Sequence, residues 1–148
     1  MCKQIIYVDM DDVLADFEKS YKYRLKQNPF ILYPQSEYGF FRKLEPIKGA
    51  IYAMEKLSEI YEVFILTAPS EMNPLCYTEK RLWVEDHLGM EWVSKLIISP
   101  DKSLFIGDYL IDDNPNSKGQ DKFQGELILF GGEEYPDWEK VLIKLLGE

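Results

Sequence analysis

Cysteine, histidine and basic residues are scarce in this sequence of 148 residues. The two cysteines, Cys2 and Cys76, lie far apart and show no repeated spacing, which argues against a disulfide scaffold and a structural zinc site. The 17 Lys and Arg residues are outnumbered by 26 Asp and Glu, giving a formal net charge of -9, and they form no cluster. Because binding to a nucleic-acid backbone needs such clusters, we expect no nucleic-acid polymer as a partner.

Long apolar runs are also missing. No stretch approaches the roughly 18–20 apolar residues of a membrane span, and Asp9 ends the first apolar run before the core of a signal peptide can form. We therefore expect a cytoplasmic protein without a membrane partner. The sequence does contain 46% hydrophobic and 14% aromatic residues, which is enough for a buried core, so we expect residues 1–148 to form a single domain.

Short apolar runs without internal polar alternation predict strands that are buried on both faces, as in a parallel sheet. They occupy residues 4–9, 63–66, 96–98, 104–106 and 127–130. Helical patterns lie among them, at about 13–27, 49–60, 75–88 and 136–146. This alternation predicts an α/β fold with right-handed crossovers.

Residues 16–45 depart from this alternation. They are rich in Phe and Tyr, are interrupted by Pro29 and Pro34, and show no strand period. We expect the helix of about 13–27 to be followed by an irregular insertion. Its aromatic side chains either pack in the ordinary way or form a lid or pocket wall, and the sequence leaves both possibilities open.

Acidic residues gather in two short segments and follow predicted strands together with other polar side chains. The polar residues at or near strand ends are Asp9, Asp11, Asp12, Thr67, Lys102, Asp108, Asp112 and Asp113. Clustered like charges destabilise a fold unless a cation or a phosphate accounts for them. Because ligands of open parallel sheets bind beyond the carboxyl ends of the strands, we expect these side chains to converge at one edge.

The residue types in this set suit phosphoryl chemistry. Carboxylate oxygens are preferred ligands of Mg²⁺, which usually takes one or two of them together with phosphate oxygens and water. Lys, Thr and the backbone N–H groups at Thr67 and Ala68 can hold the remaining phosphate oxygens. With the charges screened in this way, one carboxylate can attack phosphorus while a second acts as proton donor and then as base.

The same residues carry a resemblance to known proteins. Asp9-Met10-Asp11-Asp12-Val13, Thr67, Lys102 and Asp112-Asp113 resemble, in order, the four motifs of haloacid-dehalogenase-superfamily phosphatases. A closer resemblance, to the 5′(3′)-deoxyribonucleotidases, covers nearly the whole chain. Its segments are Val8-Asp9-Met10-Asp11-Asp12-Val13-Leu14-Ala15-Asp16-Phe17, Leu44-Glu45-Pro46 with Gly49-Ala50, Trp83-Val84-Glu85, Asp101-Lys102 and Leu110-Ile111-Asp112-Asp113.

This resemblance implies a fold and an activity. The fold is a Rossmannoid three-layer sandwich with a central parallel sheet and a small, mainly helical cap over about 16–45, inserted after the first strand. The activity is Mg²⁺-dependent hydrolysis of nucleoside or deoxyribonucleoside 5′- or 3′-monophosphates through an aspartyl phosphate. The substrate is thus expected to be a small phosphomonoester.

The resemblance also implies roles for residues. Asp9 is the nucleophile and a metal ligand, Asp11 is the general acid and base with its carbonyl on the metal, and Asp113 is a direct metal ligand. The phosphate is bound by Asp11, Thr67, the Ala68 N–H and Lys102. Asp112 or Asp108 supports the metal site, and Phe17 faces the base or sugar.

Two departures from the family pattern and two alternatives remain. Asp12 stands where most members have Gly, which either adds charge near the phosphate or alters the turn. The insertion is shorter than in mammalian relatives, so Phe40 and Phe41 are only candidates for base recognition. A phosphatase for another small phosphomonoester, such as a sugar phosphate, is the first alternative. A non-enzymatic phosphoacceptor or binding protein is the second.

Overall fold

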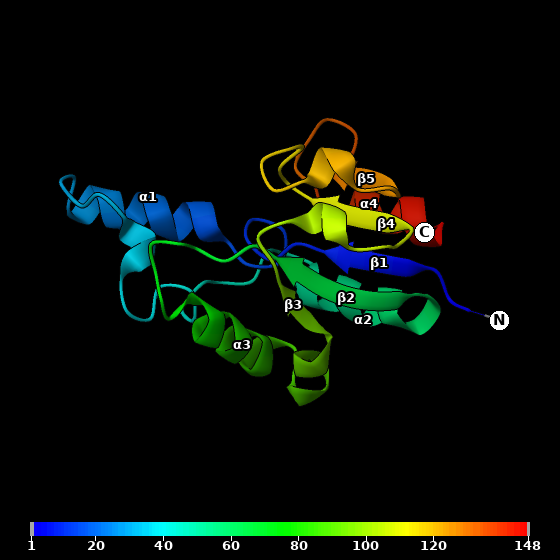
Figure 1. Cartoon of the computed structure of the whole chain (residues 1–148), viewed down its shortest axis with the longest axis horizontal. Coiled ribbons are helices and arrows are strands. Elements are labelled where there is room, and N and C mark those ends of the chain that lie inside the picture. Colours follow the sequence, from blue (N-terminus) through cyan, green and yellow to red (C-terminus); the bar gives the residue numbers. More distant parts are fainter. Residues whose placement is uncertain (1, 148) are drawn as a thin grey trace.

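The computed structural model describes residues 2–147, and its strands within that range form one parallel sheet (Figure 1). The strand order is β3-β2-β1-β4-β5. The strands are β1 (Ile5–Val8), β2 (Glu62–Thr67), β3 (Leu96–Ile98), β4 (Tyr109–Asp112) and β5 (Glu126–Leu129). The expected α/β class with a central parallel sheet is confirmed.

Four α-helices occur within the described residues, close to the predicted ranges. They are α1 (Phe17–Gln27), α2 (Ala50–Ile60), α3 (Cys76–His87) and α4 (Trp138–Leu146). Short 3-10 turns are η1 (Pro34–Ser36), η2 (Met90–Lys95), η3 (Lys102–Leu104) and η4 (Gln120–Lys122). α1 begins later than the predicted residue 13 because Asp16 caps it, with its carboxylate accepting from the N–H of Lys19 at 3.2 Å.

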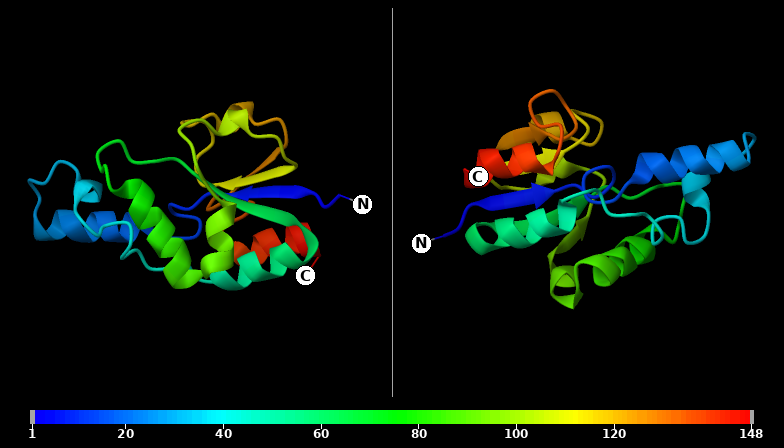
Figure 2. Two further views of the ribbon diagram at one scale, coloured as in Figure 1. Left: turned by 60° about the horizontal axis from the view of Figure 1, so that its bottom comes forward. Right: turned by 180° about the vertical axis from the view of Figure 1, so that it is seen from behind.

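The two faces of the sheet are covered differently. Alternate residues such as Ile6 and Val8 of β1 pack into the larger core beneath α2, α3 and α4. Tyr7 points the other way and packs with Leu110 and Phe123 in a smaller cluster. That face carries η3, η4 and their loops rather than α-helices, so the third layer is thin (Figure 2).

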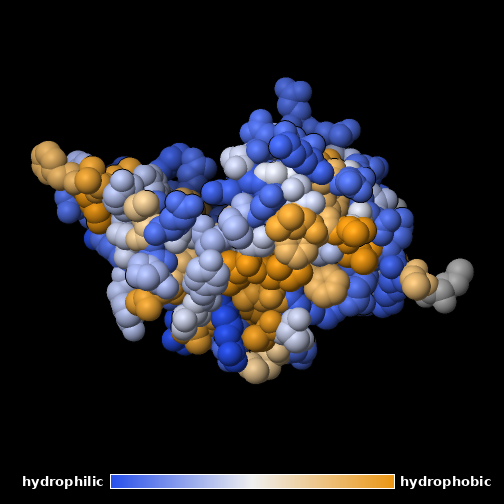
Figure 3. Space-filling view, in the orientation of Figure 1, coloured by the Kyte–Doolittle hydropathy of each residue, from blue (hydrophilic) through white to orange (hydrophobic). Residues whose placement is uncertain are grey.

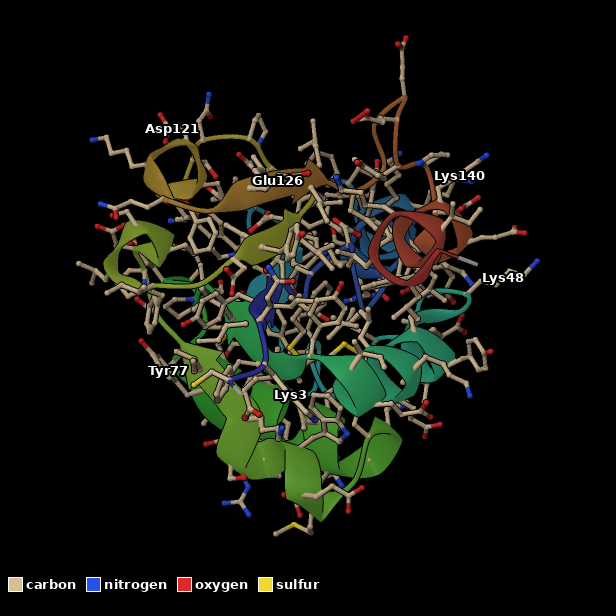
Figure 4. All side chains as sticks on the ribbon, turned by 90° about the vertical axis from the view of Figure 1, so that its right-hand side faces the viewer. Lys3, Lys48, Tyr77, Asp121, Glu126 and Lys140 are labelled. Atoms are coloured by element: carbon tan, nitrogen blue, oxygen red, sulfur yellow. The ribbon has the colours of Figure 1, made fainter. Side chains whose placement is uncertain are left out.

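The thin layer leaves apolar surface on the sheet. Figure 3 shows apolar side chains gathered on this face of the molecule. Phe64 of β2 and Ile97 of β3 belong to the smaller cluster and are only partly buried. Charged side chains cover other parts of the surface. In the view along the strands, for example, the side chains of Lys48 and Lys140 point away from the packed interior (Figure 4).

The fourth strand is not where the sequence placed it. The apolar run 104–106 begins at the last residue of η3, and its residues Leu104 and Ile106 are strongly exposed. The strand is Tyr109–Asp112 instead, which pairs with both β1 and β5. Gly107 permits the bend between the two segments, because a Cβ there would lie 2.5 Å from the ring of Tyr7.

The helices of residues 2–147 all fall short of the length and apolar character needed to traverse a lipid bilayer. α1 lies beyond the carboxyl ends of the strands, at the opposite end of the molecule from the N-terminus (Figure 1). The segment expected to form a cap therefore extends from the edge of the sheet at which ligands of such folds bind.

Candidate active site

The loop that follows β1 places two aspartates at one pocket. The N–H of Asp9 donates to the carbonyl of Ile111 at 2.8 Å and so extends the sheet by one residue. The N–H groups of Leu14 and Ala15 then both donate to the carbonyl of Met10 at 2.9 Å, which turns the chain back tightly. As a result Asp9 and Asp11, although separated by Met10, line the same cavity.

This cavity, of about 240 Å³, brings together most of the predicted residues. Its walls include Asp9, Asp11, Asp12, Phe17, Ala68, Lys102, Asp112 and Asp113, with Asn114, Ser117, Lys118 and Gln120 beyond them. Thr67 ends β2 directly below and is fully buried. The convergence follows from the parallel sheet, because these residues come from the ends of β1, β2 and β4 and from η3.

Three carboxylates crowd the floor of the pocket. One oxygen each from Asp9, Asp112 and Asp113 lies within 4.8 Å of the others. Burial raises the pKa of Asp9 well above its usual range, Lys102 opposes that shift, and Asp112 adds to it. Desolvation, with the neighbouring charges of Asp112 and Asp12, raises the pKa of Asp113 to about 6. A hard divalent cation would relieve this repulsion, and an all-oxygen donor set suits Mg²⁺.

Lys102 lies between two of these carboxylates and is 2% exposed. Its ammonium donates to Oδ1 of Asp9 at 2.9 Å and to Oδ2 of Asp112. Burial lowers the pKa of Lys102, but the two carboxylates outweigh that effect, so its pKa lies above the ordinary value. The lysine thus remains a cation in the pocket floor and pairs directly with the predicted nucleophile.

Asp112 and Asp113 are adjacent but differ in their surroundings. Asp112 is fully buried, and besides Lys102 it accepts from the N–H of Asn114 at 3.0 Å and from Nε2 of Gln120 at 3.3 Å. Asp113 is exposed toward the pocket. This arrangement fits a supporting position for Asp112 and an open oxygen on Asp113. Gln120, on η4, was not predicted, because it lies eight positions beyond Asp112 and outside any motif.

Asp108 does not join the site, and its predicted supporting role is wrong. It precedes β4, and its carboxylate accepts from the N–H of Ile5 at 2.8 Å, at the beginning of β1. The length of β4 separates it from Asp112 by about 13 Å. Its carboxylate therefore joins the starts of two strands rather than their ends.

A second buried lysine, which the sequence reading missed, lies beside the pocket. Lys80 of α3 is 0% exposed, and its Nζ donates to Oδ2 of Asp11 at 3.0 Å, to the Thr67 hydroxyl at 2.5 Å and to the carbonyl of Ala68 at 2.7 Å. Its spacing in the sequence could have revealed it. Lys80 lies on the same helix face as the apolar residues Cys76 and Trp83, which indicates a buried lysine.

Asp12 has a left-handed backbone conformation, with φ of 63°, which glycine adopts more easily than other residues. Its carboxylate accepts from the N–H of Glu18 at 2.8 Å, in the first turn of α1. The side chain therefore alters the turn and caps the helix that opens the insertion. It also lines the pocket, so both effects weighed from the sequence are present.

The aromatic residues of the insertion form a packed group next to the pocket. Phe17 lines the cavity and stacks on Tyr21, with ring centroids 5.7 Å apart. Phe40 and Phe41 contact Phe17 from below and are themselves 7% and 1% exposed. Of the three phenylalanines considered for recognition, only Phe17 lies on the cavity wall, and the other two hold it there.

Comparisons with known proteins agree with this geometry. Residues 26–138 match the family model described as 5′ nucleotidase, deoxy (pyrimidine), cytosolic type C protein. The chain is 38% identical over 99% of its length to a protein of Vibrio phage KVP40 that carries the 5′(3′)-deoxyribonucleotidase name, and covers 86% of it. It is 34% identical over 93% of its length to the human 5′(3′)-deoxyribonucleotidase, cytosolic type, and covers 78% of that protein.

Solved structures show the same fold at much lower sequence identity. The HAD-hydrolase YfnB from Bacillus subtilis, solved bound to magnesium, superposes with a TM-score of 0.71 at 11% identity, over 99% of this chain and 100% of that one. A hydrolase from Streptococcus pneumoniae gives a TM-score of 0.61. The chain thus shares its fold with haloacid-dehalogenase-type hydrolases, and the matched family model and the two relatives show that it belongs to the 5′(3′)-deoxyribonucleotidase family of phosphoric monoester hydrolases.

Proposed function

We propose that the protein is a Mg²⁺-dependent phosphatase that hydrolyses deoxyribonucleoside 5′- or 3′-monophosphates through an aspartyl phosphate. The observation that carries the proposal is the pairing of Asp9 with Lys102 in a pocket that Asp11 also lines. A carboxylate nucleophile, a cation to screen it and a second carboxyl for proton transfer are the groups that such a reaction needs. The names of the phage and human relatives support the nucleotide substrate.

The carboxylates of Asp9 and Asp113 and the carbonyl of Asp11 are proposed to hold Mg²⁺. Asp112 supports them, because its own oxygens are already engaged by Lys102, Asn114 and Gln120. When bound, the ion would neutralise charge on the phosphate and on the nucleophile. The crowding of three carboxylates within 4.8 Å is the structural reason to expect a cation here.

The proposed reaction has two steps. In the first, Asp9 attacks phosphorus, the bond from phosphorus to the leaving oxygen breaks, and Asp11 gives that oxygen a proton. In the second, Asp11 takes a proton from water, the water oxygen attacks phosphorus, and the bond to Asp9 breaks. Lys102, the N–H of Ala68 and the Thr67 hydroxyl are proposed to bind phosphate oxygens throughout, and Lys102 and Ala68 line the cavity in support of this.

Residues 16–45 are proposed to act as the cap of a single domain. α1 contains no buried residue over Phe17–Gln27, although Phe17 at its first position lines the pocket. A phenylalanine at that place offers an apolar face to the base or the sugar. The reaction is proposed to take place in the cytoplasm, in line with the cytosolic type of the human relative.

A phosphatase for another small phosphomonoester, such as a sugar phosphate, is the second candidate. The observation that favours it is the composition of the cavity wall, where Phe17 is the only aromatic residue among those described that line the pocket. A site with one aromatic contact can accept a sugar as readily as a base.

A phosphate-release screen with Mg²⁺ tests both candidates. It covers ribo- and deoxyribonucleoside 5′- and 3′-monophosphates beside sugar phosphates, with Asp9→Asn as the control that should abolish turnover. We expect preferential release from deoxyribonucleotides. Preference for sugar phosphates would support the second candidate. Activity retained by pure Asp9→Asn protein would contradict the assignment of the nucleophile.

A further inference from the structure

We propose that Lys80 is a positioning residue for phosphoryl transfer, which holds the carboxyl group of Asp11 at the pocket wall so that Asp11 can deliver the proton to the leaving group. This inference rests on the proposed function of the pocket. Lys80 comes from α3, outside the segments that contribute Asp9, Asp11, Lys102 and Asp113. Its contact with Asp11 crosses 69 positions of the chain.

The surroundings of Lys80 fix its ammonium in one place. Its three N–H donors match three acceptors, which are Oδ2 of Asp11, the Thr67 hydroxyl and the carbonyl of Ala68. Among the residues described, Asp11 is its salt-bridge partner. Burying an ammonium costs several kcal/mol unless it is paired, and apolar side chains of similar volume often replace buried ion pairs without loss. Packing alone therefore does not explain a lysine at this position.

The two oxygens of Asp11 are unequal as a consequence. Oδ2 accepts from Lys80, whereas Oδ1 is buried and has no hydrogen-bond partner among residues 2–147. A buried polar atom without a partner is uncommon in proteins and calls for an explanation. Oδ1 itself is inaccessible, but the Asp11 side chain is 28% exposed and lines the pocket. Lys80 therefore holds the Asp11 carboxyl group at the pocket wall through Oδ2 and leaves Oδ1 without a partner.

Lys80 orients Thr67 in the same way. A hydroxyl has one hydrogen to donate and two lone pairs to accept with. By donating to Oγ1, Lys80 occupies a lone pair of the hydroxyl, whose hydrogen points to the carbonyl of Ala68 at 3.5 Å. One ammonium thus orders the proton donor together with the buried end of β2, next to Ala68 on the pocket wall.

The turn of α3 that carries Lys80 also holds the insertion. The carboxylate of Glu79, 5% exposed, accepts from the N–H of Gly39 at 2.8 Å and from the N–H of Phe41 at 3.0 Å. The Phe41 ring lies 5.2 Å from Nζ of Lys80, within the range of a cation–π contact. Adjacent residues of one helix therefore fix the insertion and the proton donor together.

The positioning of Asp11 matters in the step in which the leaving group departs. As Asp9 forms its bond to phosphorus, the electron pair of the breaking P–O bond goes to the leaving oxygen, which takes the proton from the carboxyl group of Asp11. Asp11 becomes a carboxylate beside the Lys80 ammonium, which stabilises it. A leaving group that departs readily as an anion needs neither the proton nor the positioning. A nucleoside alkoxide needs both.

The test compares two leaving groups in Lys80→Met. We measure kcat/KM with Mg²⁺ for a deoxyribonucleoside 5′-monophosphate and for p-nitrophenyl phosphate, since this ratio reports the step in which the leaving group departs. The expected loss is about 100-fold or more for the nucleotide and less than about 5-fold for the nitrophenyl ester. Equal losses for both substrates, or no loss for either, would overturn the proposal.

Two controls separate this outcome from a failure of the fold or of the proposed function. Lys140→Met removes an exposed lysine of α4 and should change neither ratio (Figure 4). If the wild type prefers sugar phosphates, the nucleotide proposal fails, but a sugar phosphate then replaces the nucleotide as the poor leaving group. Lys80→Gln, which keeps an N–H donor, is the substitute if Lys80→Met does not fold.

A crystal structure of the substituted protein without substrate gives a readout that is independent of turnover. In Lys80→Met we expect the Asp11 carboxylate to rotate away from its place beside Thr67, because Oδ2 has lost its ammonium partner. A carboxylate that keeps the same position in the variant would show that Lys80 does not position it and would overturn the inference.

Discussion

The floor of the pocket and the insertion of residues 16–45 differ in how deeply their charged side chains are buried. In the floor, Asp9, Lys102 and Asp112 are less than 10% exposed and their charges are paired with one another. In the insertion, the ion pairs lie on the surface, as between Arg24 and Glu37. Buried charges are costly to leave unpaired, whereas surface pairs contribute little. The difference indicates that the chemistry depends on the floor, and that the insertion is free to vary with the substrate.

The largest expected effect is in the floor, from Lys102→Met. It removes the cation between Asp9 and Asp112, so two buried carboxylates lose their partner. We expect kcat/KM to fall about 1000-fold, as when a charge-stabilising group is lost from an active site. We also expect a loss of about 3 kcal/mol in the free energy of unfolding without metal. Steady-state kinetics and denaturant titration measure the two quantities.

Lys122→Met, in the exposed part of η4, is the matched control for Lys102→Met and should change neither quantity. A fall in kcat/KM below about 10-fold for Lys102→Met would mean that pairing with buried carboxylates is not what the pocket requires. Removing a charge from the floor would then affect kcat/KM as little as removing one from the insertion.

Asp113→Asn tests whether the charge of the floor exists for a cation. The pKa of Asp113 is raised to about 6, so the folded chain holds this proton more tightly than the unfolded chain does. Stability of the metal-free protein should therefore fall as pH rises from about 4 to about 6. Asp113→Asn should flatten that fall and raise metal-free stability at pH 7 by about 1 kcal/mol, a value reduced because solvent screens this carboxylate.

The same substitution should act in the opposite direction once Mg²⁺ is added. Wild-type protein gains stability from any ligand that binds only the folded state, and the variant should lose most of that gain. We expect kcat with Mg²⁺ to fall about 100-fold. Thermal unfolding with and without Mg²⁺, across pH 4 to 8, checks both signs. A variant that is less stable without metal would contradict the interpretation of the carboxylate cluster.

Phe17→Ala addresses the boundary between the two regions. Phe17 lines the pocket but packs on Tyr21 and Phe40, so its loss should weaken nucleotide binding and leave the catalytic groups in place. We expect KM for the preferred nucleotide to rise about 10-fold with little change in kcat. Tyr23→Ala, at an exposed position of the same helix, is the control. An unchanged ranking of nucleotide substrates would show that Phe17 is not part of the recognition surface.

The floor could be predicted from the sequence better than the rest of the site. Asp9, Thr67 and Asp112 directly follow or end apolar runs, and a parallel sheet brings such positions to one edge whatever the details of packing. Lys80 and Gln120 could not be placed in this way. Their contacts depend on how α3 and η4 settle against the sheet, which no local pattern specifies.

The errors have equally physical causes. The run at 104–106 is as apolar as Leu110-Ile111, so periodicity could not tell the exposed connector from the strand. Asp108 was grouped with Asp112 because they are close in sequence. β4 has four residues, which is long enough to put the side chain of Asp108 at the amino end of the strand and that of Asp112 at its carboxyl end.

The smallest expected effect is in the insertion, from Glu37→Gln. Glu37 accepts from Nε of Arg24 at 2.8 Å and also pairs with its second nitrogen, which joins the segment after η1 to α1. Both side chains are about one third exposed, so water replaces the pair when it is lost. We expect kcat/KM to change less than about 2-fold and the midpoint of thermal unfolding to move less than about 3 °C. Glu79→Gln removes a carboxylate that holds the same insertion from a buried position, and it should cost clearly more stability. If the two substitutions cost the same, burial would not be what distinguishes the floor from the insertion, and the insertion would be held as firmly by its surface as by its anchor on α3.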